Sequence, residues 1–440
     1  MRTNLVGRAV ALAILAVSAS APVAASAATV GSIREYRTDT PGGAPGNLGP
    51  QGITARSDGT LWFVEAASLI GRITTSGRVT EFRTAGFGTG PWGIATGPAN
   101  RLWYTEADSS AIGRMTTGGV TTRFLTPTAS AAPYGIAAGP DGNLWFTEHD
   151  AGKVGRMTPA GTITEYALGS VAAGPNGITA GPDGALWFAE FGSGKIGRIT
   201  TAGVLTEFAS DGGPSSGPIG ITTGPDGALW YTAQSANQVV RMTTAGVNTD
   251  HFNIPTPNSG ANGITTGPDG NLWFSESGEN RIGRLTTSTG LITEYPTRTA
   301  AAGPTGITVG SDGGVWVTQP NTDMIARITA ISSGPNTVSP RVSGVAKPGH
   351  TLRTTAGSWN RPRVQTSYQW LRDGHPIFIA SAASTKPARA FTYKVIDRDR
   401  GHRIGCRVSV RYAGIAVSFK AQSNALKVAP VVRPPSRFTG

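Results

Sequence analysis

Cysteine is almost absent from this sequence: Cys406 is the only one, so no intramolecular disulfide can form. Histidine occurs only five times, which leaves few groups able to exchange protons near neutral pH. Beyond the N-terminal segment, no apolar run is long enough to cross a bilayer. From residue 31 to 330 the helical spacing of apolar residues is also missing, because they fall at period two or in short runs bounded by Gly and Pro.

A unit of about 42 residues fills this region instead. Its turn and second strand read SDGTLWFVE (57–65), PANRLWYTE (98–106), PDGNLWFTE (140–148), PDGALWFAE (182–190), PDGALWYTA (225–233), PDGNLWFSE (268–276) and SDGGVWVTQ (311–319). The tryptophans stand at 62, 103, 145, 187, 230, 273 and 316, so the period is 41 to 43 residues. Four short strands per unit at this period are typical of β-propeller blades.

The seventh unit ends after residues 325–329 and lacks a fourth strand. The segment Gly31–Tyr36 matches the fourth strand of the sixth unit, residues 290–295. We therefore expect residues 32–37 to pair with residues 325–329 and to close the ring without an open sheet edge. An open β-solenoid is the alternative, and this closure argues against it. The predicted fold class is all-β: a seven-bladed β-propeller followed by a small Ig-like β-sandwich.

Residues 1–27 are typical of a secretory signal peptide, with basic residues, an apolar run at 9–17 and small residues before a cleavage site after about Ala27. We expect the protein to be secreted or held at the cell surface. The predicted divisions are a signal peptide (1–27), a propeller (28–330), a linker (331–340), an Ig-like sandwich (341–428) and a disordered tail (429–440).

The region after the ring resembles immunoglobulin-like sandwiches at Trp370 and Cys406, which match the strand C tryptophan and the strand F cysteine. The strand B cysteine is missing, so we expect Cys406 to be a buried apolar contact of Trp370. A bulge near Cys406 would disturb the alternation of the neighbouring arginines, so no single arginine stripe is predicted.

The two predicted domains carry opposite charge. Residues 28–330 hold 18 Lys and Arg against 23 Asp and Glu, whereas residues 331–440 hold 18 against 3, a net charge of +15. We expect residues 331–440 to meet an anionic cell-wall polymer or a membrane surface, with salt-dependent binding. No motif that reads a DNA groove is present, so sequence-specific nucleic-acid binding is not expected.

Two positions in each unit are expected to meet on one face of the ring, which we call the top face. One is the slot, the residue between Pro (Ala in the sixth unit) and Gly at the start of the first strand, and the other lies fourteen residues later. The pairs are Gln51/Glu65, Trp92/Glu106, Tyr134/Glu148, Asn176/Glu190, Ile219/Ala233, Asn262/Glu276 and Thr305/Gln319.

The repeat, with its GIT, PDG, LWFTE and IGRIT segments, resembles the virginiamycin B lyase family over residues 31–330. The resemblance implies a magnesium-dependent carbon–oxygen lyase that opens the ester of a cyclic depsipeptide by elimination. It also implies a catalytic histidine in the slot of the last blade, a glutamate fourteen residues later and a second histidine one blade earlier. These positions are Thr305, Gln319 and Asn262 here. Thr and Gln cannot take up a proton near pH 7, so the fold is expected to carry over without this chemistry.

The remaining glutamates have a packing interpretation. Every unit with Glu at this position carries Gly-Arg in its third strand, and the two units without it replace the glycine by Val240 and Ala326. We expect the glutamate to lie over the glycine, beside the arginine. The other interpretation is a metal or ligand site, for which the candidate ligand-binding residues are Trp92, Tyr134, Asn176, Asn262, Glu106, Glu190 and Glu276.

The acid–base candidates near the mouth of the ring are Glu148 and His149, and a lone surface histidine is the alternative for His149. Aromatic and amide side chains in the slots suit a flat, partly apolar ligand such as a small molecule or a cyclic peptide. The sequence leaves three functions open: a secreted binding protein, an active lyase of altered specificity, which would use magnesium, and a structural envelope protein. We expect a monomer.

Overall fold

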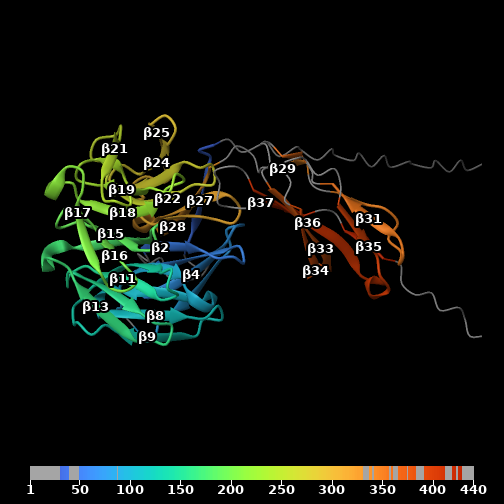
Figure 1. Ribbon diagram of the computed structural model, residues 1–440, viewed down its shortest axis with the longest axis horizontal. Helices are drawn as coiled ribbons and strands as arrows, with labels where there is room; N and C mark the ends of the chain where they lie inside the picture. The colour runs from blue at the N-terminus through green and yellow to red at the C-terminus, as the bar shows by residue number, and fades with distance from the viewer. Residues whose placement is uncertain are drawn as a thin grey trace, which may run out of the picture.

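A computed structural model describes residues 30–38, 49–86, 88–330, 336–338, 341–355, 358–359, 365–373, 375–382, 391–411, 419–422 and 425–428 (Figure 1). The predicted signal peptide and tail, and most of the predicted linker, lie outside these residues. In the described part, the regular elements are strands and short 3₁₀ turns. No helix in it is long and apolar enough to cross a membrane.

Seven four-stranded antiparallel sheets, which we call blades, form within the described part of residues 30–330. Blade 1 holds β2 (Pro50–Ala55), β3 (Thr60–Glu65), β4 (Leu69–Thr74) and β5 (Val79–Arg83), and blade 2 holds β6 (Pro91–Thr96), β7 (Leu102–Glu106), β8 (Ala111–Met115) and β9 (Thr121–Leu125). Blade 3 holds β10 (Pro133–Ala138), β11 (Leu144–Glu148), β12 (Lys153–Met157) and β13 (Ile163–Ala167), and blade 4 holds β14 (Pro175–Ala180), β15 (Leu186–Glu190), β16 (Lys195–Ile199) and β17 (Leu205–Ala209). Blade 5 holds β18 (Pro218–Thr223), β19 (Leu229–Ala233), β20 (Gln238–Met242) and β21 (Asn248–Asn253), and blade 6 holds β22 (Ala261–Thr266), β23 (Leu272–Glu276), β24 (Arg281–Thr286) and β25 (Leu291–Pro296). Blade 7 holds β26 (Ile307–Val309), β27 (Gly314–Gln319), β28 (Met324–Thr329) and β1 (Ile33–Arg37).

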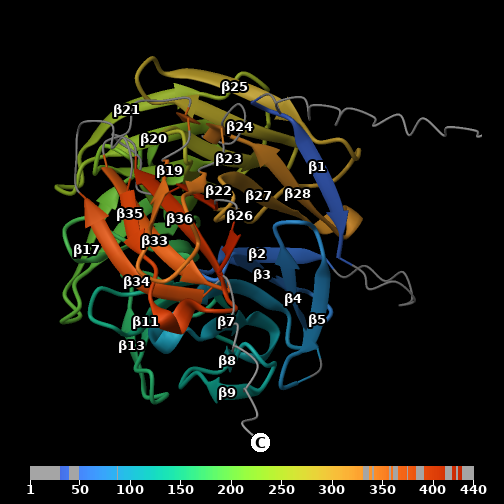
Figure 2. The same ribbon diagram turned by 90° about the vertical axis from the view of Figure 1, so that its right-hand side faces the viewer.

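The first strands of successive blades contact one another around a ring, and β26 of blade 7 contacts β2 of blade 1 (Figure 2). The N-terminal strand completes the last blade. β1 pairs with β28 in an antiparallel register that runs from Ile33 opposite Ile328 to Arg37 opposite Met324. The predicted pairing of the N-terminal segment is therefore confirmed, and it ties the two ends of the ring together.

Each repeat tryptophan is buried between two blades. Trp62 packs with Ile94 and Leu102 of the next blade. Its ring stacks on Phe82 of its own outer strand at a centroid distance of 5.3 Å, and the Arg72 guanidinium lies 5.7 Å from the ring centroid. Burying such a side chain contributes on the order of 2–3 kcal/mol. The predicted packing role of the tryptophans is confirmed.

The Pro-Asp-Gly segments form the turns between the first and second strands. In blade 4, Asp183 Oδ1 accepts a hydrogen bond from Trp187 Nε1 at 3.0 Å, and Asp183 Oδ2 accepts one from Arg198 Nε at 2.7 Å. Gly184 has a φ of +76°, which the turn requires. The turn carboxylate therefore anchors the tryptophan and the arginine.

The C-terminal region contains further sheets. One pairs β30 (Val342–Ser343), β31 (Thr351–Thr354) and β35 (Phe391–Lys394), and another has the order β34 (His375–Ala382), β33 (Gln365–Arg372), β36 (Arg403–Arg411) and β37 (Phe419–Gln422), with β38 (Leu426–Lys427) paired to β36. A short pair joins β29 (Asn336–Val338) to β32 (Ser358–Trp359). The 3₁₀ turns of the described chain are η1 (Pro98–Asn100), η2 (Ala107–Ser109), η3 (Val171–Ala173), η4 (Gly213–Ser215), η5 (Pro320–Thr322) and η6 (Asp397–Asp399).

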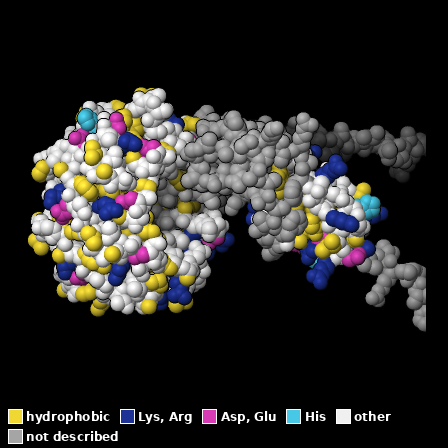
Figure 3. Space-filling model, viewed as in Figure 1, with side chains coloured by type: hydrophobic (Ala, Val, Ile, Leu, Met, Phe, Trp, Pro, Cys, Tyr) yellow, Lys and Arg dark blue, Asp and Glu magenta, His cyan; other side chains and the backbone are white. Residues whose placement is uncertain are grey.

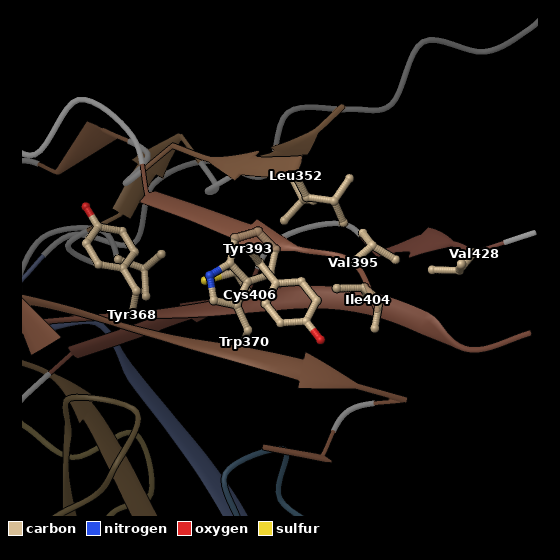
Figure 4. Close-up of a cluster of buried hydrophobic side chains, with 10 residues drawn as sticks. Leu352, Tyr368, Trp370, Tyr393, Val395, Ile404, Cys406 and Val428 are labelled. Atoms are coloured by element: carbon tan, nitrogen blue, oxygen red, sulfur yellow. The ribbon is translucent and has the colours of Figure 1, made fainter. Parts of the chain in front are cut away.

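One hydrophobic core joins the two larger C-terminal sheets (Figure 4). Trp370 and Cys406 lie opposite each other in the β33–β36 pair, and both are fully buried. Burial raises the pKa of the Cys406 thiol to about 11, which keeps it neutral. The predicted contact between these two residues is therefore confirmed, while the assignment of the region to the immunoglobulin-like class stays an interpretation.

The expectation of a bulge near Cys406 is wrong. β33 and β36 pair without a register shift from Gln365 opposite Arg411 to Arg372 opposite Ile404. Ile404, Cys406 and Val408 therefore share the core face of β36, as the period of two in a strand requires.

Candidate functional site

The slot residues begin the innermost strand of each blade. In blade 3 the β10–β11 register shifts between Pro133 and Ile136, which places Tyr134 and Gly135 in a bulge. A Cβ on Gly135 would lie only 2.3 Å from the carbonyl oxygen of Asn176 in the next blade. Glycine after the slot is therefore required by the close approach of neighbouring blades.

Hydroxyl groups connect neighbouring blades beside the slots. The Gly135 amide donates to Thr147 Oγ at 2.8 Å, and the Thr147 hydroxyl donates to the Asn176 carbonyl at 2.6 Å. Equivalent hydroxyl bonds to the next slot carbonyl run from Thr105 to Tyr134, Thr232 to Asn262, Ser275 to Thr305 and Thr318 to Gln51. Val64 and Ala189 occupy the matching position in blades 1 and 4. These bonds are not among the features predicted from the sequence, although Thr or Ser directly before the last residue of the second strand is a visible signal of them.

Three aromatic rings from two blades stack on one side of the mouth, and we call them the aromatic ladder. Trp92 stacks on Tyr134 at a centroid distance of 4.8 Å, and Tyr134 stacks on His149 at 4.6 Å, with interplanar angles of 16° and 17°. Trp92 is 39% exposed, so one end of the ladder is accessible to solvent. The structure thus brings together three residues that the sequence analysis had singled out separately.

A polar groove of about 530 Å³ borders the ladder at Tyr134. Its lining includes the exposed side chains of Asp108, Asp150 and Ser130. Burial raises the pKa of Tyr134, and the negative charges of Asp150 and Asp108 raise it further. The groove can therefore offer an aromatic surface, hydrogen-bonding groups and negative charge to a ligand.

His149 belongs to the ladder and also contacts a carboxylate. Its Nδ1 lies 2.7 Å from Oδ1 of Asp150, and its side chain is 28% exposed. A carboxylate at this distance orients the imidazole.

The second-strand glutamates do not reach into the mouth. The side chains of Glu106, Glu148, Glu190 and Glu276 are fully buried, and Glu65 is buried in the same way. A Cβ on Gly197 would lie 2.8 Å from Glu190 Oε1, and one on Gly283 would lie 2.6 Å from Glu276 Oε1. In blades 4 and 6 the glutamate therefore lies close to the third-strand glycine, as the packing interpretation expected, although the atoms nearest to the glycine belong to the rings of Phe188 and Phe274.

The arginine that follows this glycine is not beside the glutamate. Arg198 pairs with Trp187 across the strands and its guanidinium lies 5.8 Å from the Trp187 ring centroid, on the opposite face of the sheet from Gly197. Blades 5 and 7 keep this arginine, as Arg241 and Arg327, without the glutamate. The expected link between glutamate and arginine is therefore wrong. In the blades with glutamate, the third-strand glycine leaves room for the second-strand aromatic ring.

Most of these glutamates face a second carboxylate from the outer strand. Burial, and then the charge of Glu165 and hydrogen bonding to it, raise the pKa of Glu148 to about 8. In blade 6, burial and the neighbouring Glu294 raise the pKa of Glu276 to about 8. In blade 4, burial raises the pKa of Glu190 to about 7, against a hydrogen bond from Ser193. Near neutral pH the protonated form of Glu148 and Glu276 is therefore favoured, which makes these two acids poor bases, whereas Glu190 is divided between its two forms.

Blade 2 replaces the outer-strand carboxylate by Arg123, whose Nε donates to Glu106 Oε2 at 2.7 Å. Burial raises the pKa of Glu106, and the Arg123 charge opposes that shift. Blade 5 fills the same space with Ala233 and Val240, which are both fully buried. The row of glutamates is thus a variable part of the blade interior.

Of the positions that the family resemblance assigns to chemistry, Gln319 is engaged in packing, while the side chains of Thr305 and Asn262 are half-buried. Gln319 is fully buried, and its Nε2 donates to Oε1 of Glu35 on the closing strand at 3.0 Å. Thr305 Oγ lies 3.0 Å from Thr318 Oγ, and the Asn262 carbonyl accepts the Thr232 hydroxyl. None of these three side chains can take up a proton near pH 7.

Magnesium prefers several oxygen ligands, usually carboxylates and waters, in octahedral geometry. Beside Gln319 the carboxylate is Glu35, which already accepts hydrogen bonds from Thr299 and Gln319. No group of three or more His, Cys, Asp and Glu side chains suited to a metal occurs in the described chain. The donors at these positions therefore do not fit a magnesium ion.

A closed ring of four-stranded blades, with buried tryptophans between blades and slots around a central mouth, defines a β-propeller. The sequence profile of the Virginiamycin B lyase family matches residues 15–213 and 210–335, and the chain belongs to this family.

Solved structures agree with this assignment. Virginiamycin B lyase from Staphylococcus aureus is 38% identical, with 68% of this chain and 99% of that chain covered and a TM-score of 0.64. A streptogramin B lyase structure is 36% identical, with 67% and 96% covered and a TM-score of 0.63. A catalytically inactive histidine-to-alanine variant of the Staphylococcus aureus enzyme with quinupristin is 39% identical, with 68% and 99% covered and a TM-score of 0.64. No curated protein sequence matches the chain.

Proposed function

We propose that this chain is a secreted, lyase-like propeller that binds a ligand at the mouth of the ring without cleaving it. The observation that carries the proposal is the pair Thr305 and Gln319, which stands where the resemblance implies a histidine and a glutamate. Gln319 is also held by Glu35 in the closing strand. Elimination needs a group that removes a proton, and neither side chain can do so.

The ligand contacts the aromatic ladder and the adjoining groove. Trp92 offers an accessible ring, Tyr134 joins the ladder to the groove, and Asp108 and Asp150 supply acceptors. Related propellers are lyases of streptogramin B antibiotics by name, and one was solved with quinupristin. A cyclic depsipeptide with aromatic side chains is the first ligand class to test, because its rings can stack on Trp92.

The basic residues 331–440 hold the propeller to an anionic surface. Their net charge of +15 contrasts with the mildly acidic residues 28–330. Basic side chains are visible on the described C-terminal part in Figure 3. Attraction to a cell-wall polymer or to an anionic membrane would concentrate the propeller at the cell surface, where it can meet an external ligand.

The test is a turnover assay with a panel of cyclic depsipeptides, with and without magnesium, combined with a binding titration of the same compounds. We expect saturable binding and no linear product. Linear product from any member of the panel would overturn the non-catalytic assignment. If the protein neither binds nor cleaves any compound of the panel, the result would favour a structural envelope protein.

One observation favours a second function, a lyase of altered specificity. His149 and Asp150 form a pair at 2.7 Å beside the groove, and an imidazole oriented by a carboxylate can act as a general base. Loss of turnover in His149→Gln, together with unchanged binding, would identify this function. Glu148 does not support it, because its buried carboxyl stays protonated at neutral pH.

A further inference from the structure

The sheet β30–β31–β35 has one face in the core and one in solvent. Val342, Leu352 and Tyr393 point into the core. Strand residues alternate between faces, so their neighbours point outward. The outward residues of this sheet are all exposed: Arg341, Ser343, Thr351, Arg353, Thr355, Thr392 and Lys394.

Three cations form a diagonal row across this exposed face, and we call it the basic row. The Thr355 amide donates to the Arg341 carbonyl, and the Arg341 amide donates to Thr355 Oγ, so these two residues lie opposite each other. Arg353 lies opposite both Ser343 and Thr392, and Lys394 lies opposite Thr351. Arg341 and Arg353 are therefore diagonal neighbours, and so are Arg353 and Lys394. Diagonal neighbours on a sheet are roughly 7–8 Å apart.

The basic row has no internal counter-charge. Within the described residues no ion pair involves Arg341, Arg353 or Lys394, whereas Arg372 pairs with Asp399 and Arg400 pairs with Asp397. Every other outward side chain of the sheet is Ser or Thr. Neighbouring like charges destabilise a sheet, and a bound polyanion would remove that cost.

We propose that the basic row binds a linear phosphodiester polymer of the cell wall, of the poly(glycerol phosphate) type. Successive cations can meet successive phosphates, and the four hydroxyls can donate to phosphate oxygens. The face carries no aromatic side chain for stacking bases and no large apolar side chain for insertion into a lipid surface. This inference rests on the proposed anchoring role and assigns it a surface and a ligand class.

The test uses the full chain and immobilised poly(glycerol phosphate), with retention measured from about 50 to about 500 mM salt. The row variant is Arg341→Gln, Arg353→Gln and Lys394→Gln. The matched control is Arg398→Gln, Arg403→Gln and Lys427→Gln, which removes the same charge from exposed positions outside this sheet. Thermal unfolding of each variant checks that it remains folded.

We expect the row variant to bind at least tenfold more weakly near 100 mM salt, and its log–log salt slope to fall by about 2, since each lost phosphate contact lowers the slope by about 0.7. The control should stay within about twofold of the wild type, because its cations lie off the row.

Equal losses in both variants, or no loss in either, would overturn the assignment to this face. Tighter binding of duplex DNA or of phosphatidylglycerol vesicles than of the polymer, at equal salt, would overturn the ligand class. Failure of the wild type to bind any polyanion would instead remove the anchoring role itself.

Discussion

The two sides of the propeller mouth differ in what their side chains are free to do. On the side of blades 6 and 7, Asn262, Thr305 and Gln319 stand where the family resemblance implies chemistry, and Gln319 is buried against the closing strand. On the side of blades 2 and 3, Trp92 and His149 flank Tyr134 in a stacked ladder with one accessible end.

The contrast teaches that one scaffold can lose reactive groups on one side of its mouth and keep a recognition surface on the other. The blade framework is the same on both sides, because the hydroxyl bonds between blades and the protonated glutamate pairs recur in each. The slot residues, together with His149 after the second strand of blade 3, change what the mouth presents. The predictions below separate what the two sides share from what divides them, in order of decreasing effect.

Thr147→Val, on the ladder side, should destabilise the fold by about 2–3 kcal/mol, because the Gly135 amide and the Asn176 carbonyl both lose their partner. Ser275→Ala breaks the equivalent bonds on the other side and should cost about the same. Urea denaturation measures both. Blade 1 has a fully buried valine at this position, so Val64→Ala measures the cost of shortening a core side chain here when no hydroxyl is lost. A large cost on one side alone would show that the framework is not shared.

Gln319→Leu should destabilise the fold by about 1–2 kcal/mol, because Glu35 loses one of its donors inside the closing blade. The pKa of Glu35 is raised by burial but lowered overall by hydrogen bonds from Thr299 and Gln319, so the substitution should also raise it. NMR titration of Glu35 and thermal unfolding measure the two effects. Gln238→Leu, which removes an exposed hydrogen bond to Asn253, is the control and should change stability little. An unchanged Glu35 pKa would mean that Gln319 does not hydrogen-bond to Glu35 in the folded protein.

Both sides should lose stability as pH rises. Folding raises the pKa of Glu148 and Glu276 from an ordinary value near 4.5 to about 8, so the folded state holds protons that the unfolded state releases. The stabilisation is present in full below pH 4.5 and is lost as pH rises through about 8. We expect the melting temperature to fall over this range and to fall less steeply in Glu148→Gln and Glu276→Gln. A pH profile identical to that of the wild type in both variants would contradict this assignment.

His149→Gln should lower stability by about 0.5–1 kcal/mol, because it removes the outer ring of the ladder. His251→Gln is the matched control, since His251 lies on an outer strand with an exposed side chain 3.0 Å from Asp211. Thermal unfolding of the two variants under one set of conditions compares the two losses. Equal effects of the two substitutions would mean that the ladder contributes no stability.

The ring could be predicted from the sequence because its signals are local and repeated. The spacing of the tryptophans predicts the blades, and the truncated seventh unit predicts the pairing of the N-terminal strand. The direction of the glutamate side chains could also be predicted. Glu148 lies two residues after Phe146 in the same strand, so both side chains point to the same face, and Phe146 lies opposite Gly155 in the blade interior.

The aromatic ladder could not be predicted, because its rings come from three separate segments. Trp92 and Tyr134 sit in bulges, where the period of two no longer fixes the side-chain direction. His149 follows a strand rather than lying in one. The basic row needed the register of three C-terminal strands, which composition alone does not supply.

The most direct measurement compares Trp92→Ala with Asn262→Ala in a fluorescence titration with a cyclic depsipeptide that binds the wild type. Both residues occupy slots, on opposite sides of the mouth, and neither side chain is buried. The account predicts at least a tenfold loss of affinity for Trp92→Ala, about 1.4 kcal/mol, and less than a twofold loss for Asn262→Ala. A larger loss for Asn262→Ala than for Trp92→Ala would place the ligand on the side of blades 6 and 7 and contradict the central claim.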